Sequence, residues 1–190
     1  MTDFRHGSGR LCLDFIRTLR YRGSAGVIEE LPDGAALIGW VDQFGPYEGD
    51  VAGVSGPAQV AGAQRLREAI HQLITAARGP GGVRVCGPAA RRRINDAATH
   101  PVPAPSLDVG GRIRWAAADP VEAMLAMLAR DALDLATSDA IGRIRGCANP
   151  DCGALFLDSS RPGTRRWCSM DTCGNLAKKE TLRRKADTRA

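Results

Sequence analysis

Residues 147–173 read CANPDCGALFLDSSRPGTRRWCSMDTC and contain four of the six cysteines of the chain. The spacing is Cys147-x4-Cys152, then fifteen residues, then Cys168-x4-Cys173. Two close pairs at this separation are typical of metal ligands in a reducing compartment. Four thiolates supply the closed tetrahedral shell of a structural zinc site. The sequence therefore predicts that these four cysteines bind one Zn²⁺ ion.

Two other interpretations of the clustered cysteines stay open at this point. The four thiols could form two disulfides, or one pair could be a redox site. The Cys-x4-Cys spacing differs from the Cys-x-x-Cys spacing of thioredoxin-like redox sites, which favours the metal. The two remaining cysteines, Cys12 and Cys86, lie in apolar surroundings, and we expect both to be buried as small hydrophobic residues.

The residues around the cysteines predict how the chain folds about the metal. Residues 148–151 are turn formers, so the first pair is expected to curl into a knuckle. Residues 155–157 and 165–167 are predicted to form two strands of a hairpin. A helix is predicted to follow, with Ser169 as its N-cap and Cys173 in its first turn. Knuckle, hairpin and helix together predict a treble-clef-like zinc module.

The positive charge of the chain is concentrated in this C-terminal part. The chain carries a formal net charge of +5, but its first 142 residues hold 15 basic and 16 acidic side chains, whereas the last 48 hold 11 and 5. Four thiolates around Zn²⁺ carry a charge of -2, which lowers the surplus of the module from +6 to +4. Such asymmetry favours a negatively charged partner.

We predict that this partner is DNA, while RNA stays open because the sequence does not separate the two. The alternative for the C-terminal helix is that its basic residues only favour the helix dipole and solubility. The candidate nucleic-acid contacts are Arg161, Arg165, Arg166, Lys178, Lys179, Arg183 and Lys185.

Composition and segment lengths exclude several classes of protein. The chain has 190 residues, 44% hydrophobic and 25% charged, which is an ordinary globular composition and neither disordered nor fibrous. No stretch approaches about 18 uninterrupted apolar residues, and the N-terminus lacks a signal-peptide pattern. We therefore expect a cytoplasmic protein without a membrane partner.

The N-terminal part is predicted to be mostly helical, with a small antiparallel β-sheet. Capping and breaking residues divide it into segments. The expected helices cover residues 10–22, 34–44, 57–78, 88–99 and 120–141, the last of them central and buried. A short strand is expected at 83–86, and a hairpin with a two-residue turn at Gly110-Gly111. The predicted fold class is α+β, with a domain over residues 1–142 and the zinc module over 143–190.

Catalytic signatures are missing from the sequence. It has no Gly-x-Ser-x-Gly elbow, P-loop or His-Glu-x-x-His motif, and we predict no enzymatic activity. One carboxylate stands out, because Asp14 lies between two apolar residues and a buried Asp needs a partner such as Arg17 or Arg67. These three residues are candidates for binding a small-molecule effector, and the alternative is a structural ion pair.

Several motifs also resemble a known family. Residues 165–178, RRWCSMDTCGNLAK, resemble the signature of the CGNR zinc fingers, found at the C-terminus of bacterial proteins with an ABATE domain. Residues 11–18 (LCLDFIRT), 66–70 (LREAI) and 95–98 (NDAA) resemble segments of that domain. The resemblance implies a stress-induced transcription regulator. The sequence departs from the family pattern at Leu176, where the family has Arg, and at Arg17, where it usually has Asn.

Taken together, these observations predict a zinc-binding transcription regulator with an N-terminal domain that senses an effector or dimerises. Its oligomeric state is left open. The alternative is a small-molecule-binding protein in which the zinc module is structural or docks a protein partner. Leu176 favours this alternative, because a cation is missing beside the metal site.

Overall fold

The structure, a computed structural model, describes residues 3–48, 51 and 55–187, with side chains described as far as Arg183. Six α-helices are present among the described residues: α1 (Leu11–Ile16), α2 (Gly34–Phe44), α3 (Pro57–Arg78), α4 (Pro88–Thr99), α5 (Pro120–Thr137) and α6 (Asn175–Asp187). The strands are β1 (Leu19–Arg20), β2 (Ile28–Glu29), β3 (Ala104–Leu107), β4 (Ile113–Ala116), β5 (Ile144–Gly146) and β6 (Leu155–Leu157). They form three separate antiparallel pairs, β1–β2, β3–β4 and β5–β6. The predicted α+β class, mainly helical with small antiparallel sheets, is confirmed.

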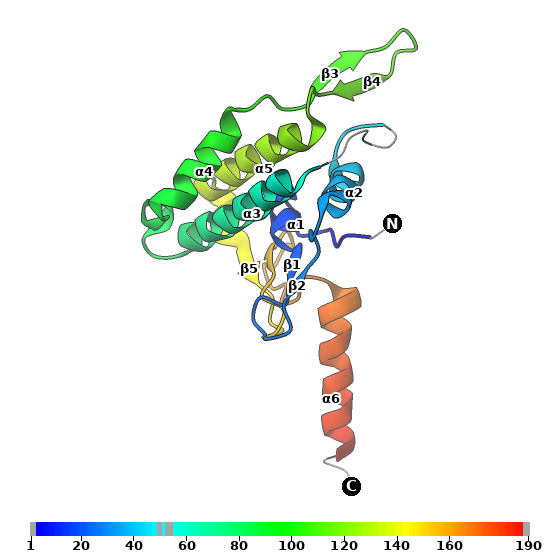
Figure 1. The fold of residues 1–190 in the computed structure, drawn as a ribbon. Coiled ribbons are helices and arrows are strands. Elements are labelled where there is room, and N and C mark those ends of the chain that lie inside the picture. The colour runs from blue at the N-terminus through cyan, green and yellow to red at the C-terminus, as the bar shows by residue number, and fades with distance from the viewer. Residues whose placement is uncertain (1–2, 49–50, 52–54, 188–190) are drawn as a thin grey trace.

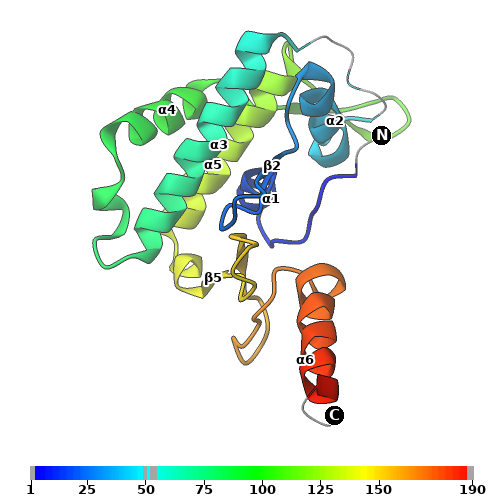
Figure 2. The same cartoon turned by 60° about the horizontal axis from the view of Figure 1, so that its bottom comes forward.

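Helix α5 is the centre of the main core. It lies beside α3 and α4 in both views (Figures 1 and 2) and also packs against α1 and α2. Met124, Leu128, Ala129 and Ala132 are fully buried on it, and the alanines allow the neighbouring helices to approach closely. The prediction of a central buried helix is confirmed, although α5 ends at Thr137 and a 3-10 helix, Asp139–Arg143, replaces its expected last turn.

Local capping chemistry explains why the central helices begin where the sequence predicts. The Asp33 carboxylate accepts a hydrogen bond from the Ala36 amide at 2.9 Å, and Asp119 accepts one from the Glu122 amide at 3.0 Å. Each satisfies one of the free N–H groups at a helix start. Helices α3, α4 and α5 each begin with a proline, whose fixed φ suits the first helical position.

The first predicted helix is wrong in its second half. Helix α1 ends at Ile16, and the chain then forms β1 instead of continuing to residue 22. The Thr18 hydroxyl donates to the carbonyl of Phe15, which ends the helix, while the carbonyl of Thr18 accepts from the Glu30 amide. The β1–β2 ribbon is held from outside by Arg67 of α3, which forms a bidentate pair with Glu29. This long-range contact overrides the local helical periodicity.

Two smaller expectations are also wrong. Residues Gly82–Val85 form a 3-10 helix and no strand, since no neighbouring strand pairs with them among the described residues. The β3–β4 hairpin exists, but its turn is longer than two residues. The Asp108 amide donates to the Arg112 carbonyl, and the Gly111 amide donates back to the Asp108 carbonyl. Gly111 has a φ of +76°, so the turn is a three-residue loop that requires glycine at this position.

The C-terminal part sits against one end of the helical body, as expected from the short connection. Ile144 and Leu155 belong to the main core, and the Leu157 amide donates to the Ser8 carbonyl at 2.8 Å. Helix α6 instead points away from the body in both views (Figures 1 and 2). None of the described helices is both long enough and apolar enough to cross a lipid bilayer.

Candidate metal centre

The first two clustered cysteines lie in a knuckle at the tip of the β5–β6 hairpin. The Cys147 amide donates to the Ala154 carbonyl at 2.9 Å, and the Cys152 amide donates to the Asn149 carbonyl at 3.1 Å. Asn149 also accepts the Asp151 amide on its side-chain oxygen, an Asx turn that tightens the loop. These local bonds bend the chain so that both thiols face the same side.

The predicted pairing of strands around the knuckle is partly wrong. Strand β6 is present as predicted, but its partner is Ile144–Gly146 and not residues 165–167. Burial explains the choice, because Leu155 belongs to the main core while Phe156 is fully buried among the cysteines. The Arg165 amide donates to Asp158 in the turn and is not available for a strand ladder. The knuckle is therefore the loop of the hairpin.

The last two cysteines come from an extended segment and a helical turn. Cys168 lies in the segment before the turn, and Cys173 lies in a wide, π-helical turn, Met170–Gly174, that leads into α6. The Gly174 amide donates to the Ser169 carbonyl at 3.0 Å, which closes this turn. Ser169 precedes the turn as predicted, but its side chain makes no capping bond among the described residues. The position of Cys173 in the first turn agrees with the prediction.

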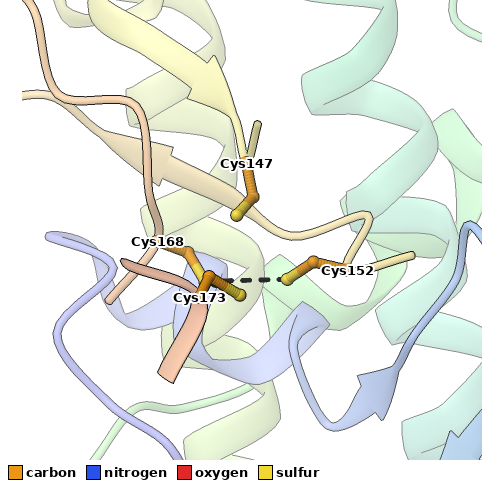
Figure 3. A group of neighbouring side chains, drawn as sticks. All are labelled: Cys147, Cys152, Cys168 and Cys173. Atoms are coloured by element: carbon orange, nitrogen blue, oxygen red, sulfur yellow. Dashed lines mark hydrogen bonds between the residues drawn. The ribbon is translucent and has the colours of Figure 1, made fainter. Parts of the chain in front are cut away.

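The four thiols converge on one point (Figure 3). All four Sγ atoms of Cys147, Cys152, Cys168 and Cys173 lie within 4.8 Å of one another. The Sγ atoms of Cys152 and Cys168 are 3.6 Å apart, and those of Cys168 and Cys173 are 3.8 Å apart. A tetrahedral ion with metal–sulfur bonds of about 2.3 Å requires sulfur–sulfur distances of about 3.8 Å. The donor set and its spacing therefore fit one zinc-sized ion.

The surroundings of the thiols also suit a structural metal site. Three of the four cysteines are buried and Cys147 is half-buried, so the group is shielded by Phe156 and Trp167. The Asn149 side-chain amide approaches the Cys173 sulfur at 3.7 Å and can donate to it, as groups around metal ligands commonly do. All six cysteines are free thiols, and the 3.6 Å between the Cys152 and Cys168 sulfurs is much longer than a disulfide bond of about 2.05 Å.

Hydrogen bonds within the group perturb the acidity of the thiols. The pKa of Cys147 is lowered because the thiols of Cys152 and Cys168 donate hydrogen bonds to its sulfur. The corresponding bond to Cys147 raises the pKa of Cys152 to about 11 and also raises the pKa of Cys168. One thiolate is thus stabilised by its neighbours, and a thiolate is the form that binds metal.

The two isolated cysteines lie elsewhere, as expected. Cys12 and Cys86 are buried at 0% and 4% exposure, in the main core. Burial raises the pKa of the Cys12 thiol well above its usual range. Both behave as small hydrophobic residues.

The three candidate effector residues separate into two groups. Asp14 accepts the Ser8 and Gly7 amides at 2.8 and 3.3 Å and lies 3.7 Å from Arg17. Arg67 is placed instead with Glu29, at 2.6 Å for both hydrogen bonds, and with Glu68 at 2.9 Å. All three are buried. These contacts give each residue a structural role, and a role in effector binding stays a prediction.

The candidate nucleic-acid residues differ in how they are used. Five of them are exposed: Arg161, Arg166, Lys178, Lys179 and Arg183. Arg165 is half-buried and turns inward, where its guanidinium donates to the carbonyls of Trp167 at 2.9 Å and Cys168 at 2.5 Å. It also lies 4.5 Å from the centre of the Phe156 ring. Arg165 thus packs against the side of the cysteine cluster. The side chain of Lys185 lies outside the described ones.

Comparison with known families agrees with this geometry. A family model described as "ABATE: Putative stress-induced transcription regulator" matches residues 9–139. The chain belongs to the ABATE family. The CGNR zinc finger model matches residues 143–186 of this ABATE protein, a range that includes all four converging cysteines. A search among curated proteins gave no match.

Some residues of the site are not evident from sequence patterns. Asp158 accepts the Ser160 amide and shapes the turn after β6, and only the turn-forming residues that follow it hint at this. Asn149, by contrast, lies in the turn that the sequence predicts. The inward orientation of Arg165 could not be predicted from the sequence, because the adjacent Arg166 is the same type of residue and is exposed.

Proposed function

We propose that this protein is a cytoplasmic transcription regulator in which residues 143–190 form a zinc module that contacts DNA. Residues 1–142 would form a domain that senses an effector or dimerises. The convergence of four thiols at the base of an exposed basic helix is the observation that carries this proposal. Zinc would be structural, because four thiolates complete its shell and leave no open position for chemistry.

Zinc is favoured over other metals by the donor set. A tetrahedral arrangement of four sulfurs suits Zn²⁺ and iron–sulfur centres, and the zinc-finger family match favours zinc. Protein produced with zinc should contain one equivalent per chain, and a strong chelator should unfold the module because metal binding supplies its folding free energy. Protein that contains no zinc and has its four clustered cysteines oxidised would refute the metal assignment.

The DNA contact is supported by charge and exposure. Helix α6 projects from the body, so its side chains Lys178, Lys179 and Arg183 are accessible to a phosphate backbone (Figure 1). Arg166 is exposed beside the metal site, with its guanidinium 5.2 Å from the centre of the Trp167 ring. Phosphate contacts of this kind supply affinity with little sequence preference, so base recognition would need additional residues.

The test is the salt dependence of binding. If about four phosphates are neutralised, log K should fall with log salt at a slope of about -3.6. Lys178→Ala and Arg183→Ala should each reduce the slope by about 1. Arg91→Ala, which removes an exposed charge on α4, is the matched control and should leave the slope unchanged. The DNA proposal fails if zinc-loaded protein shows no binding at low salt, and equal slopes for RNA would extend it to both nucleic acids.

The second candidate function follows from Leu176 and Arg165. Leu176 is 49% exposed where the family has a cation, and Arg165 is turned toward the metal site. Both reduce the charge that the module can offer to phosphate. A protein that binds a small molecule and uses the module to dock a protein partner would bind no nucleic acid even at low salt, while retaining zinc.

A further inference from the structure

The β3–β4 hairpin projects from the end of the helical body that lies away from α6 (Figure 1). Every residue of β3 is exposed, and so are three of the four residues of β4. In the described chain, no other helix or strand packs extensively on the hairpin. A two-stranded hairpin alone is only marginally stable in water, because it has nothing on which to bury a face. Neither the metal site nor the basic helix explains this extension.

One face of the hairpin is entirely apolar. The register pairs Pro105 with Trp115 and Leu107 with Ile113. Because side chains alternate along a strand and directly paired residues share a face, these four side chains lie on one side of the ribbon. The exposed fractions are 73% for Leu107, 57% for Ile113 and 37% for Trp115, and Pro105 is exposed as well. These four residues form what we call the apolar hairpin face.

The charges of the hairpin lie away from the apolar hairpin face. Arg114 comes between two of its residues and therefore points to the opposite side of the ribbon. There it pairs with Asp108 at 3.0 Å and with Glu48. The apolar hairpin face thus offers no cation to a phosphate backbone, and two copies of it would meet without like charges opposite each other.

The size of the face suits a weak contact between two chains. With Val109 at the tip, which is fully exposed, the apolar hairpin face leaves about 550 Å² of surface in water on each chain. Two such faces packed together would bury about 1,100 Å², which is near the lower limit for a specific protein interface. An interface of this size predicts a reversible dimer with a dissociation constant of micromolar order.

We propose that the apolar hairpin face packs against the same face of a second copy of this chain across a two-fold axis. Pairing of strand edges would extend the sheet and leave the face in water, whereas face-to-face packing covers it. Because the hairpin and α6 lie at opposite ends of the molecule, both basic helices stay accessible in such a dimer (Figure 1). The inference rests on the proposed function, in that it takes the dimerising role of residues 1–142 and assigns it a surface.

The proposal is tested by sedimentation equilibrium of the full zinc-loaded protein, without nucleic acid, at about 1 to 200 µM protein. Ile113→Arg places a charge on the apolar hairpin face of each copy. Ala104→Arg places the same charge on the opposite, exposed side of the same hairpin and is the matched control. A mixture of Ile113→Arg with Ile113→Glu places opposite charges on the two facing copies. Circular dichroism and zinc content establish that each variant is folded and loaded.

The mean mass should rise from one chain towards two across this range. Ile113→Arg and Ile113→Glu alone should each weaken association at least about tenfold, because like charges then meet across the axis. Their mixture should restore association, which separates a contact at this face from damage to the hairpin. Ala104→Arg should associate like the unmodified protein.

Four outcomes would overturn the proposal. The first is a single chain at every concentration, whether the face then binds phosphatidylcholine vesicles, as a lipid-binding surface would, or binds nothing. The others are a dimer that Ile113→Arg leaves unchanged, an equal loss with Ala104→Arg, and no association in the mixture. A dimer that survives Ile113→Arg would keep a dimerising N-terminal domain and refute only this face. Because no DNA is present, each of these failures is separate from failure of the DNA contact.

Discussion

Replacing Arg165 by alanine should weaken the metal module and leave phosphate contacts intact. The guanidinium donates to the carbonyls of Trp167 and Cys168, which flank the third clustered cysteine, and stacks on the Phe156 ring. Hydrogen bonds from a charged donor contribute about 1.5 kcal/mol each, and an exposed cation–π contact adds about 0.5 kcal/mol. Since the side chain is only half-buried, we expect a net loss of about 2–3 kcal/mol.

Zinc affinity reports this loss directly, because metal binding and folding of the module are coupled. A loss of about 2–3 kcal/mol corresponds to zinc binding weaker by about 30- to 140-fold. Competition with a fluorescent zinc chelator at pH 7 measures the affinity. The matched control is Arg166→Ala, whose exposed side chain makes no such carbonyl contact, and it should keep the zinc affinity while weakening DNA binding. The reasoning is refuted if Arg165→Ala binds zinc like the unmodified protein and loses as much DNA affinity as Arg166→Ala.

Three further outcomes are expected. Asp119→Ala should destabilise the protein by about 1 kcal/mol in urea unfolding, because the Glu122 amide loses its cap; an unchanged midpoint would contradict the capping role. Burial and Arg22 lower the pKa of His71, so the unfolded chain takes up a proton before the folded one as the pH drops below about 6.5, and stability falls. His71→Gln should reduce this fall in stability between pH 7 and 5. Parallel stability curves for the two proteins would exclude this role of His71. Leu176→Arg, at an exposed position, should tighten DNA binding and steepen its salt slope by about 0.9, and an unchanged slope would place position 176 outside the DNA contact.

The starts of α2, α3 and α5 and the ends of α2 and α3 could be predicted from the sequence because their signals are local. An aspartate before the helix, a proline at its first position and a glycine after its end act within a few residues of chain. The metal ligands could be proposed for the same reason, since each cysteine pair is five residues apart and the turn between its members is short-range chemistry. In each of these segments the tertiary contacts favour the same conformation as the local sequence.

Strand pairing could not be predicted in the same way. Residues 165–167 and 144–146 are both plausible partners for β6, and the choice depends on which face of β6 meets the helical core. The end of α1 also depends on distant contacts. The residues after Ile16 form strand β1 of the β1–β2 ribbon, and Arg67 of α3 holds this ribbon in place through Glu29. Residues 82–85 have strand-forming valines but no partner strand among the described residues, and they become a 3-10 helix.

By itself, the sequence determined the cluster of four cysteines that could hold a metal, the helical body and the concentration of positive charge in the last quarter of the chain. The tertiary structure decided how that charge is placed: it turns Arg165 toward the cysteine cluster and leaves Arg166, Lys178, Lys179 and Arg183 exposed. It also brings Arg5, Arg20 and Arg22 against residues 152–155, more than a hundred positions away. The reason is physical, because caps and turns depend on neighbouring residues, whereas the environment of a side chain depends on which distant surfaces the core brings together.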